Sequence, residues 1–232
     1  MLHFAGGNCY SFRFLATQLK DFEVITPELP GRGKRMDEPL LNDFDQAALD
    51  LYGQLVKRLK PVPFLIYGHS MGAYLALRIA GMLEKAGWPP SYLIVSGNAG
   101  PGAGNNSKKR YLMKGGAFIS ELKTLGGVPQ ELLDDEEVFR FFEPVIRADF
   151  EIAEENNMQQ EPAINTPLYA IMGSQEEAAD QLSNWGRFTK ARFSYEILEG
   201  NHFFIYKHPQ RLADIIRHCH KTGIFPIVKP IQ

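Results

Sequence analysis

The sequence has little cysteine, no long apolar run and no block of like charge. Its two cysteines, Cys9 and Cys219, stand at opposite ends of the 232 residues. They lack the spacing of a metal site and the number that a disulfide framework needs, so we expect neither. Such sparing use of cysteine is typical of a reducing, cytoplasmic compartment.

The absence of a long apolar run argues against a membrane protein. No stretch approaches the roughly 20 apolar residues that a membrane-spanning helix requires. The N-terminus also lacks the charged segment and apolar run of a signal peptide. Residues 1–4 are mostly apolar and meet a glycine pair at once, which indicates a very short first strand or residues missing before it.

Charge of the two signs is nearly balanced, with a net charge of −2. No basic stripe is present, so we expect no nucleic-acid partner. Apolar residues make up 44% and charged residues 22%, which is typical of a globular protein. The length suits one α/β domain, and we expect residues 1–232 to form it.

Short apolar runs alternate with amphipathic segments, a pattern that predicts an α/β fold with a mostly parallel central sheet flanked by helices. Strands are predicted at residues 22–26 (FEVIT), 63–67 (PFLIY), 92–95 (YLIV), 168–172 (LYAIM) and 193–198 (FSYEIL). Helices are predicted around residues 47–59, 71–85, 180–190 and 209–220.

Residues 101–164 break this alternation, and we call them the lid. Helical pieces are predicted around residues 114–125, 134–142 and 145–155, with no strand between them. Such an insertion between two strands predicts a helical cap over the sheet. Its apolar side chains would either roof a ligand pocket or form the lid's own core: Phe118, Leu122, Leu125, Val138, Phe139 and Phe142.

A nucleophile motif stands at residues 68–72 (GHSMG), between a predicted strand and a predicted helix. G-x-S-x-G in this context places a serine on a strained turn, where flanking glycines remove side chains that would clash. Ser70 is therefore the predicted nucleophile. The alternative is a glycine-rich turn that merely caps a helix.

A serine needs a base, which in this arrangement follows the last strand. His202 lies in a loop after residues 193–198 and is the predicted base. His3 precedes the serine, His69 lies within the motif, and His208, His218 and His220 belong to the terminal helix.

The acid that orients the base should follow the preceding strand. No Asp comes directly after residues 168–172, but Glu176, Glu177 and Asp180 lie close behind. Glu can orient an imidazole as Asp does, and Glu176 is the first choice. A solvated acidic loop is the alternative.

Two backbone N–H groups should bind the oxyanion of the reaction. Met71, directly after the nucleophile, is the first predicted donor. Phe4, at the start of residues 4–7 (FAGG), is the second.

With these motifs the chain resembles the type II thioesterases, the free-standing editing enzymes of non-ribosomal peptide and polyketide synthases, and their relative, the medium-chain fatty acyl thioesterase. The resemblance covers nearly the whole chain. It rests on residues 4–7 (FAGG), 29–33 (LPGRG), 38–39 (EP), 68–72 (GHSMG), 125–129 (LGGVP), 147–150 (RADF) and 200–204 (GNHFF). It implies an α/β-hydrolase fold with a helical lid.

The sequence departs from this family at three positions. His3 stands where the family usually has Pro, Asn201 where it usually has Gly, and Glu176 where it normally has Asp. The last departure bears on the acid directly. Gly173 closes the strand and fixes the register, which favours Glu176 over its neighbours.

The resemblance implies hydrolysis of acyl thioesters on the phosphopantetheine arm of a carrier protein, without a cofactor. We expect the protein to be a monomer. The rivals are chain termination on medium-chain acyl carrier proteins, and a small-molecule esterase, lipase or acyltransferase of the same fold. A third rival is a protein that keeps the fold but only binds a ligand.

Overall fold

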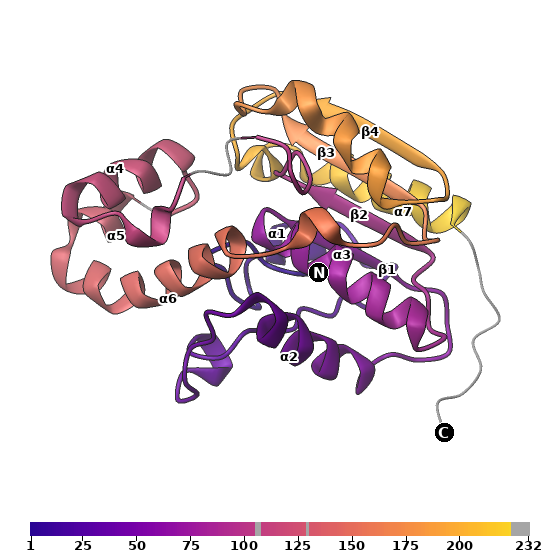
Figure 1. Ribbon diagram of the computed structural model, residues 1–232, viewed down its shortest axis with the longest axis horizontal. Coiled ribbons are helices and arrows are strands. Elements are labelled where there is room, and N and C mark those ends of the chain that lie inside the picture. Colours follow the sequence, from indigo (N-terminus) through magenta and orange to yellow (C-terminus); the bar gives the residue numbers. More distant parts are fainter. Residues whose placement is uncertain (105–107, 129, 224–232) are drawn as a thin grey trace.

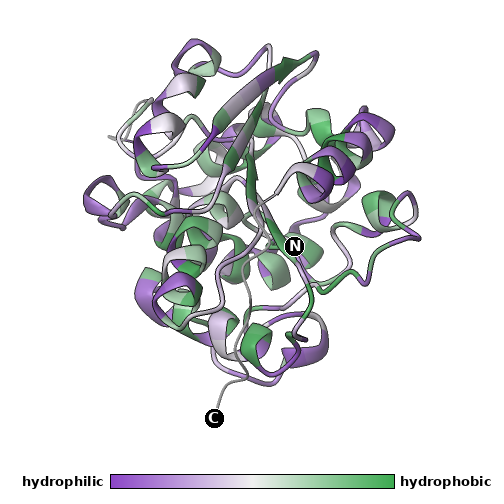
Figure 2. Ribbon diagram, turned by 90° about the vertical axis from the view of Figure 1, so that its right-hand side faces the viewer, coloured by the Kyte–Doolittle hydropathy of each residue, from purple (hydrophilic) through white to green (hydrophobic). Residues whose placement is uncertain are grey.

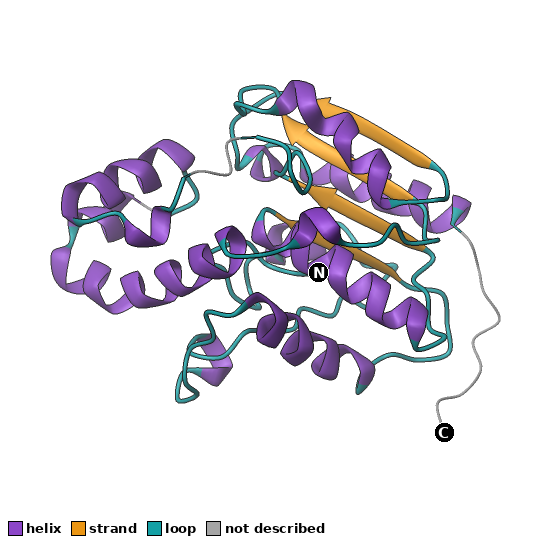
Figure 3. Ribbon diagram, in the orientation of Figure 1, coloured by secondary structure: helices purple, strands orange, loops and turns teal. Residues whose placement is uncertain are grey.

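A four-stranded parallel sheet forms the centre of the molecule in a computed structural model, which describes residues 1–104, 108–128 and 130–223 (Figures 1 and 3). The strands lie in chain order and every neighbouring pair is parallel. They are β1 (Leu65–His69), β2 (Tyr92–Ser96), β3 (Leu168–Gly173) and β4 (Phe193–Leu198). Four of the five predicted strands are therefore confirmed.

Helices cover both faces of the sheet, and we call the sheet with these helices the body. Helices α2 (Phe44–Val56) and α3 (Met71–Lys85) pack on one face, and α1 (Arg13–Ala16) and α7 (Pro209–Thr222) on the other. Successive residues of β2 divide between the two cores, since Leu93 and Val95 join one and Tyr92 and Ile94 the other. This alternation explains why the strands are apolar throughout.

The helices of the body are amphipathic. Helix α2 begins where the Asp43 side chain accepts a hydrogen bond from the Gln46 backbone, and it buries Ala47, Leu51 and Leu55. Figure 2 shows hydrophobic and hydrophilic segments on the same helices, as packing against a core requires. No helix of the described residues is long and apolar enough to cross a membrane.

The lid is a helical lobe beside the body, at the left of Figure 1. It contains α4 (Gly115–Leu125), α5 (Gln130–Asp134) and α6 (Glu136–Glu154). The sequence predicted a break near residue 143, but α6 continues through Pro144. Apolar residues on both sides of the proline, such as Phe139 and Ile146, are buried on one face, and this packing outweighs the lost backbone hydrogen bond.

Two other predictions were wrong. Residues 22–26 form no strand; Ile25 accepts one hydrogen bond from Met1, and no ladder follows. The segment predicted as a helix around residues 180–190 is 3₁₀ helix η4 (Ala179–Phe188). The first apolar run contributes a single parallel bridge, from Leu2 to Gly68. The remaining 3₁₀ turns are η1 (Gly33–Arg35), η2 (Arg110–Leu112), η3 (Met158–Gln160) and η5 (Phe204–Tyr206).

Candidate active site

Ser70 occupies a strained turn between β1 and α3. Its backbone has φ 56° and ψ −117°, and among the described residues it is the only non-glycine residue with positive φ. A Cβ on Gly68 would lie 2.1 Å from the Gly72 carbonyl oxygen, and one on Gly72 would lie 2.3 Å from the Leu2 carbonyl oxygen. Both glycines of the motif are therefore sterically required.

Ser70, His202 and Glu176 form a chain of hydrogen bonds. Ser70 Oγ lies 3.0 Å from His202 Nε2, and His202 Nδ1 lies 2.6 Å from Glu176 Oε2. The His202 side chain is 17% exposed and that of Glu176 is 9% exposed, so the acid is shielded while the base can reach solvent or substrate. The three predicted residues thus come together from the ends of three strands.

The longer side chain of Glu176 folds back onto its own turn. Its Oε1 accepts a hydrogen bond of 2.9 Å from the Gly173 backbone, which leaves Oε2 for His202. A Cβ on Gly173 would lie 2.5 Å from the Asn201 carbonyl oxygen, so this glycine lets the acid and base loops approach. The two alternatives, Glu177 and Asp180, are exposed, and within the described residues the carboxylate bonded to His202 is that of Glu176.

The other histidines lie elsewhere, except for His69. His208 Nε2 lies 2.7 Å from the Glu199 carbonyl oxygen, His218 is exposed, and His220 packs on Phe22. His3 is buried, and its Nδ1 donates to the Phe4 carbonyl. Burial lowers the pKa of His3.

Behind the nucleophile, His69 takes part in a buried polar cluster that the sequence did not predict. Its Nδ1 lies 2.8 Å from Ser96 Oγ, which lies 2.7 Å from the Tyr67 hydroxyl. The His69 ring lies 5.1 Å from that of His202. Burial, and to a smaller extent His202, holds the pKa of His69 well below its usual value. A neutral ring thus lies beside the predicted base.

The predicted oxyanion donors flank the serine. Phe4 opens a turn in which its carbonyl accepts the Gly7 N–H at 2.9 Å, with Gly6 at φ 75° as the turn requires. Met71 is the first residue of α3. Among the hydrogen bonds of the described residues, neither the Phe4 nor the Met71 N–H donates to a protein acceptor. Both N–H groups are available to a ligand.

A cavity of about 630 Å³ lies between body and lid and is lined by Ser70 and His202. Of the six apolar lid residues predicted to roof a pocket, Leu125 lines it; Phe118, Leu122 and Phe139 are in the lid core, and Val138 and Phe142 are exposed. The interpretation as lid core therefore holds for three of them.

Charged side chains of the lid also line this cavity. Arg110 pairs with Glu121 at 2.9 Å and with Glu154 at 3.0 Å. Burial raises the pKa of Glu154, although Arg110 opposes this shift. In the described part of the chain, no group of three or more His, Cys, Asp or Glu is arranged to hold a metal ion.

Comparison with known proteins identifies the family. The family model described as "Thioesterase domain" matches residues 1–222. The chain belongs to the thioesterase family. This family hydrolyses thioesters, and the sequence-based prediction of family and fold is confirmed.

Individual relatives align with this chain over most of their length. Linear gramicidin dehydrogenase LgrE of Brevibacillus parabrevis is 31% identical over 221 residues, which cover 92% of this chain and 84% of the relative. Gramicidin S biosynthesis protein GrsT of Aneurinibacillus migulanus is 29% identical over 200 residues, covering 85% and 78%. Because the first name denotes a dehydrogenase, the thioesterase assignment rests on the family model.

The fold matches a solved type II thioesterase. BorB, from the borrelidin biosynthetic cluster, superposes with a TM-score of 0.86 at 29% identity, covering 94% of this chain and 90% of BorB. One residue of the segment 125–129, on which the resemblance partly rests, is Pro129, and it lies outside the described residues.

Proposed function

We propose that this thioesterase removes acyl groups from the phosphopantetheine arms of carrier proteins in non-ribosomal peptide or polyketide synthesis. The observation that carries the proposal is the chain of hydrogen bonds from Ser70 through His202 to Glu176 at the wall of an open cavity. The likeness to BorB, from the borrelidin biosynthetic cluster, and to the gramicidin S biosynthesis protein GrsT supports the substrate class.

In the acylation half-reaction, Ser70 Oγ attacks the thioester carbonyl carbon while His202 Nε2 accepts the hydroxyl proton. The carbonyl electron pair moves onto oxygen, where the Phe4 and Met71 N–H groups donate to it. When the tetrahedral intermediate collapses, the C–S bond breaks and His202 returns the proton to the pantetheine thiolate. Glu176 holds the imidazole orientation and balances the charge that forms on it.

In the deacylation half-reaction, water takes the place of the thiol. His202 removes a proton from water, which attacks the acyl-serine carbonyl at the same oxyanion site. The C–O bond to Ser70 then breaks, and His202 returns the proton to Oγ. The steps use residues of this chain and water alone.

We also propose that residues 1–232 act as one domain with the lid at residues 101–164, as a cytoplasmic monomer. The carrier protein would reach the site past the lid, because lid residues such as Arg110 and Leu125 line the cavity. Movement of the lid would then gate entry of the arm.

The test compares three substrates that carry the same acetyl group. We expect kcat/KM for acetyl on a synthase carrier protein to exceed that for acetyl-coenzyme A, and both to exceed that for a simple acetyl ester. A higher kcat/KM for the coenzyme A thioester would contradict the carrier assignment. A preference for decanoyl over acetyl carrier would favour chain termination on medium-chain carriers.

A fluorophosphonate probe separates an enzyme from a protein that only binds. We expect stoichiometric labelling of the wild-type chain and none of Ser70→Ala, because the probe reacts only with an activated serine. Absence of labelling in the folded wild type would favour the binding protein.

A further inference from the structure

Arg32 and Asp149 form a buried ion pair beside the candidate active site. Arg32 Nη1 lies 2.5 Å from Asp149 Oδ2, and Nη2 lies 2.8 Å from Oδ1, so the two side chains meet in a bidentate arrangement. Arg32 is 5% exposed and Asp149 is fully buried. The residues are 117 positions apart, and each belongs to a segment outside the hydrogen-bonded chain of Ser70.

Both partners also hold the turn at residues 4–7. Asp149 Oδ2 accepts a hydrogen bond of 2.8 Å from the Gly6 N–H, and Arg32 Nη1 donates to the Gly7 carbonyl at 3.3 Å. The pair therefore fixes one donor and one acceptor of the turn that Phe4 opens. A Cβ on Gly6 would lie 3.2 Å from the Ile146 side chain, which shows how closely α6 approaches this turn.

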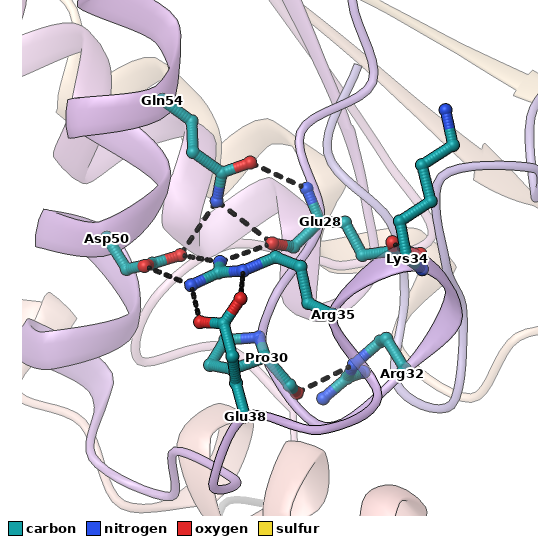
Figure 4. A network of polar contacts seen from close by, with 8 residues as sticks. All are labelled: Glu28, Pro30, Arg32, Lys34, Arg35, Glu38, Asp50 and Gln54. Atoms are coloured by element: carbon teal, nitrogen blue, oxygen red, sulfur yellow. Dashed lines mark hydrogen bonds and ion pairs between the residues drawn. The ribbon is translucent and has the colours of Figure 1, made fainter.

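Arg32 lies beside a polar network, drawn in Figure 4, in which its one contact is with Pro30. Its Nε donates to the Pro30 carbonyl, and the neighbouring Arg35 binds both Glu38 and Asp50. Glu28 accepts hydrogen bonds from the backbone N–H groups of Cys9 and Lys34. The bond from Cys9 joins this network to the segment that follows the turn at residues 4–7. Asp149, in contrast, comes from lid helix α6.

An ion pair buried this deeply is a poor source of stability, because desolvation of both charges offsets their attraction. Apart from one hydrogen bond to the Pro30 carbonyl, the remaining hydrogen bonds of the pair go to the turn of the predicted oxyanion site, at Gly6 and Gly7. Fixed backbone dipoles accelerate a reaction only if they are already in place when charge develops. These two observations indicate a positioning role.

We propose that Arg32 and Asp149 are positioning residues that hold the Phe4 N–H in place for the oxyanion, and that α6 of the lid thereby completes the oxyanion hole. The proposal rests on the proposed function, in which Phe4 donates to the thioester oxygen. Neither side chain lines the cavity that Ser70 and His202 border. The position of the lid and the geometry of the oxyanion hole are therefore coupled through Asp149.

The test is Asp149→Asn, which keeps the size of the side chain and removes the charge. We expect kcat to fall about 10- to 100-fold with KM within about threefold, because the turn loosens but the substrate cavity remains. Affinity for a boronic acid, whose serine adduct is tetrahedral and anionic, should fall in parallel with kcat/KM. Affinity for the non-reactive acyl-pantetheine amide should stay within about threefold.

Asp50→Asn is the matched control. Asp50 binds Arg35 through two hydrogen bonds but does not contact residues 4–7, so kcat should stay near that of the wild type. If Asp149→Asn lowered boronic acid and amide affinity equally, or matched Asp50→Asn in kcat, the positioning role would be wrong. An active Ser70→Ala enzyme would instead overturn the proposed function.

Arg32→Lys provides a second variant if Asp149→Asn does not fold. It keeps the charge but cannot bind Asp149 and Gly7 in the same fork. We expect a kcat loss of about 5- to 50-fold, and near-UV circular dichroism should match that of the wild type. Wild-type kcat and boronic acid affinity in folded Arg32→Lys would contradict the proposal.

Discussion

The body and the lid contribute to one cavity but are stabilised in different ways. The body has an extensive apolar core on each face of the sheet. Among the described residues, the lid has one small buried cluster of its own, formed by Phe118, Leu122, Leu133, Phe139 and Ile146. At its C-terminal end, Ile152, Met158 and Ile164 pack into the body core. Around that cluster, ion pairs and a cation–π contact of Arg147 with Phe118 at 4.0 Å join its segments.

This difference assigns the catalytic chemistry to the body and access to the cavity to the lid. Ser70, His202 and Glu176 all follow strands of the body, where packing fixes their separation. Away from its C-terminal end, the lid has only a small buried apolar cluster, and such regions open locally at lower free energy than a large core. The lid can therefore move without disturbing the proposed triad, although Asp149 links it to the oxyanion turn.

The largest loss of kcat should come from substitutions in the body. We expect Ser70→Ala and His202→Ala each to lower kcat by about 10³-fold or more, and the double variant to be little worse, since the residues act as a unit. His208→Ala and His218→Ala serve as controls and should retain wild-type kcat. An equal loss of kcat in either control would show that the base is misassigned.

Glu176→Gln should follow, with a loss of about 10²- to 10⁴-fold in kcat, because the amide cannot balance the charge on His202. Glu177→Gln is the matched control from the next position and should stay within a few-fold of the wild type. Steady-state kinetics on one carrier-bound substrate measures both. Comparable losses in the two variants would contradict the assignment of Glu176.

A substitution in the lid core should affect access rather than chemistry. Phe118→Ala removes a fully buried ring, at a cost of about 3–5 kcal/mol to the local packing. We expect faster amide hydrogen exchange in α4 and α6, with unchanged exchange in β1 to β3. Phe141→Ala, at a position 60% exposed, is the control. Uniformly faster exchange in the body would mean that the two parts unfold together.

The smallest effect is the dependence of folding stability on pH, and it concerns the body alone. Burial lowers the pKa of His3 and His69, so the folded chain keeps them neutral while the unfolded chain protonates them below about pH 6.5. Stability is thus fully present above that pH and decreases as pH falls toward the folded pKa values. The slope is up to about 1.4 kcal/mol per pH unit for each histidine.

Urea unfolding between pH 5.5 and 7.5 measures this slope. His69→Asn should reduce the slope while lowering stability at every pH, and exposed His218→Asn should leave it unchanged. An identical slope in His69→Asn and the wild type would exclude His69 as a source of the acid sensitivity.

The sequence predicted the sheet and the strained turn at Ser70 well because both depend on local patterns. The strands are apolar runs, and the turn at residues 68–72 needs glycines on both sides for steric reasons visible in the motif. Glu176 could be ranked first through the register of Gly173 and the family resemblance. Its hydrogen bond to the Gly173 backbone, which lets a longer side chain serve, could not be foreseen.

Features that depend on distant parts of the chain were missed. The link between Arg32 and Asp149 spans 117 residues, and neither position carries a local sign of the other. The sequence divided residues 134–155 into two helical pieces, whereas burial of residues on both sides of Pro144 keeps α6 intact. Residues 22–26 have the composition of a strand, but their backbone has no ladder partner in the described chain.

The positive φ of Ser70 makes selection for stability and selection for activity conflicting demands. A non-glycine residue in this conformation costs about 1–3 kcal/mol, and a glycine at position 70 would avoid most of it. A library screened for thermal resistance alone would therefore enrich Ser70→Gly and lose the hydroxyl. Any effort to engineer a more robust enzyme has to screen for turnover at the same time.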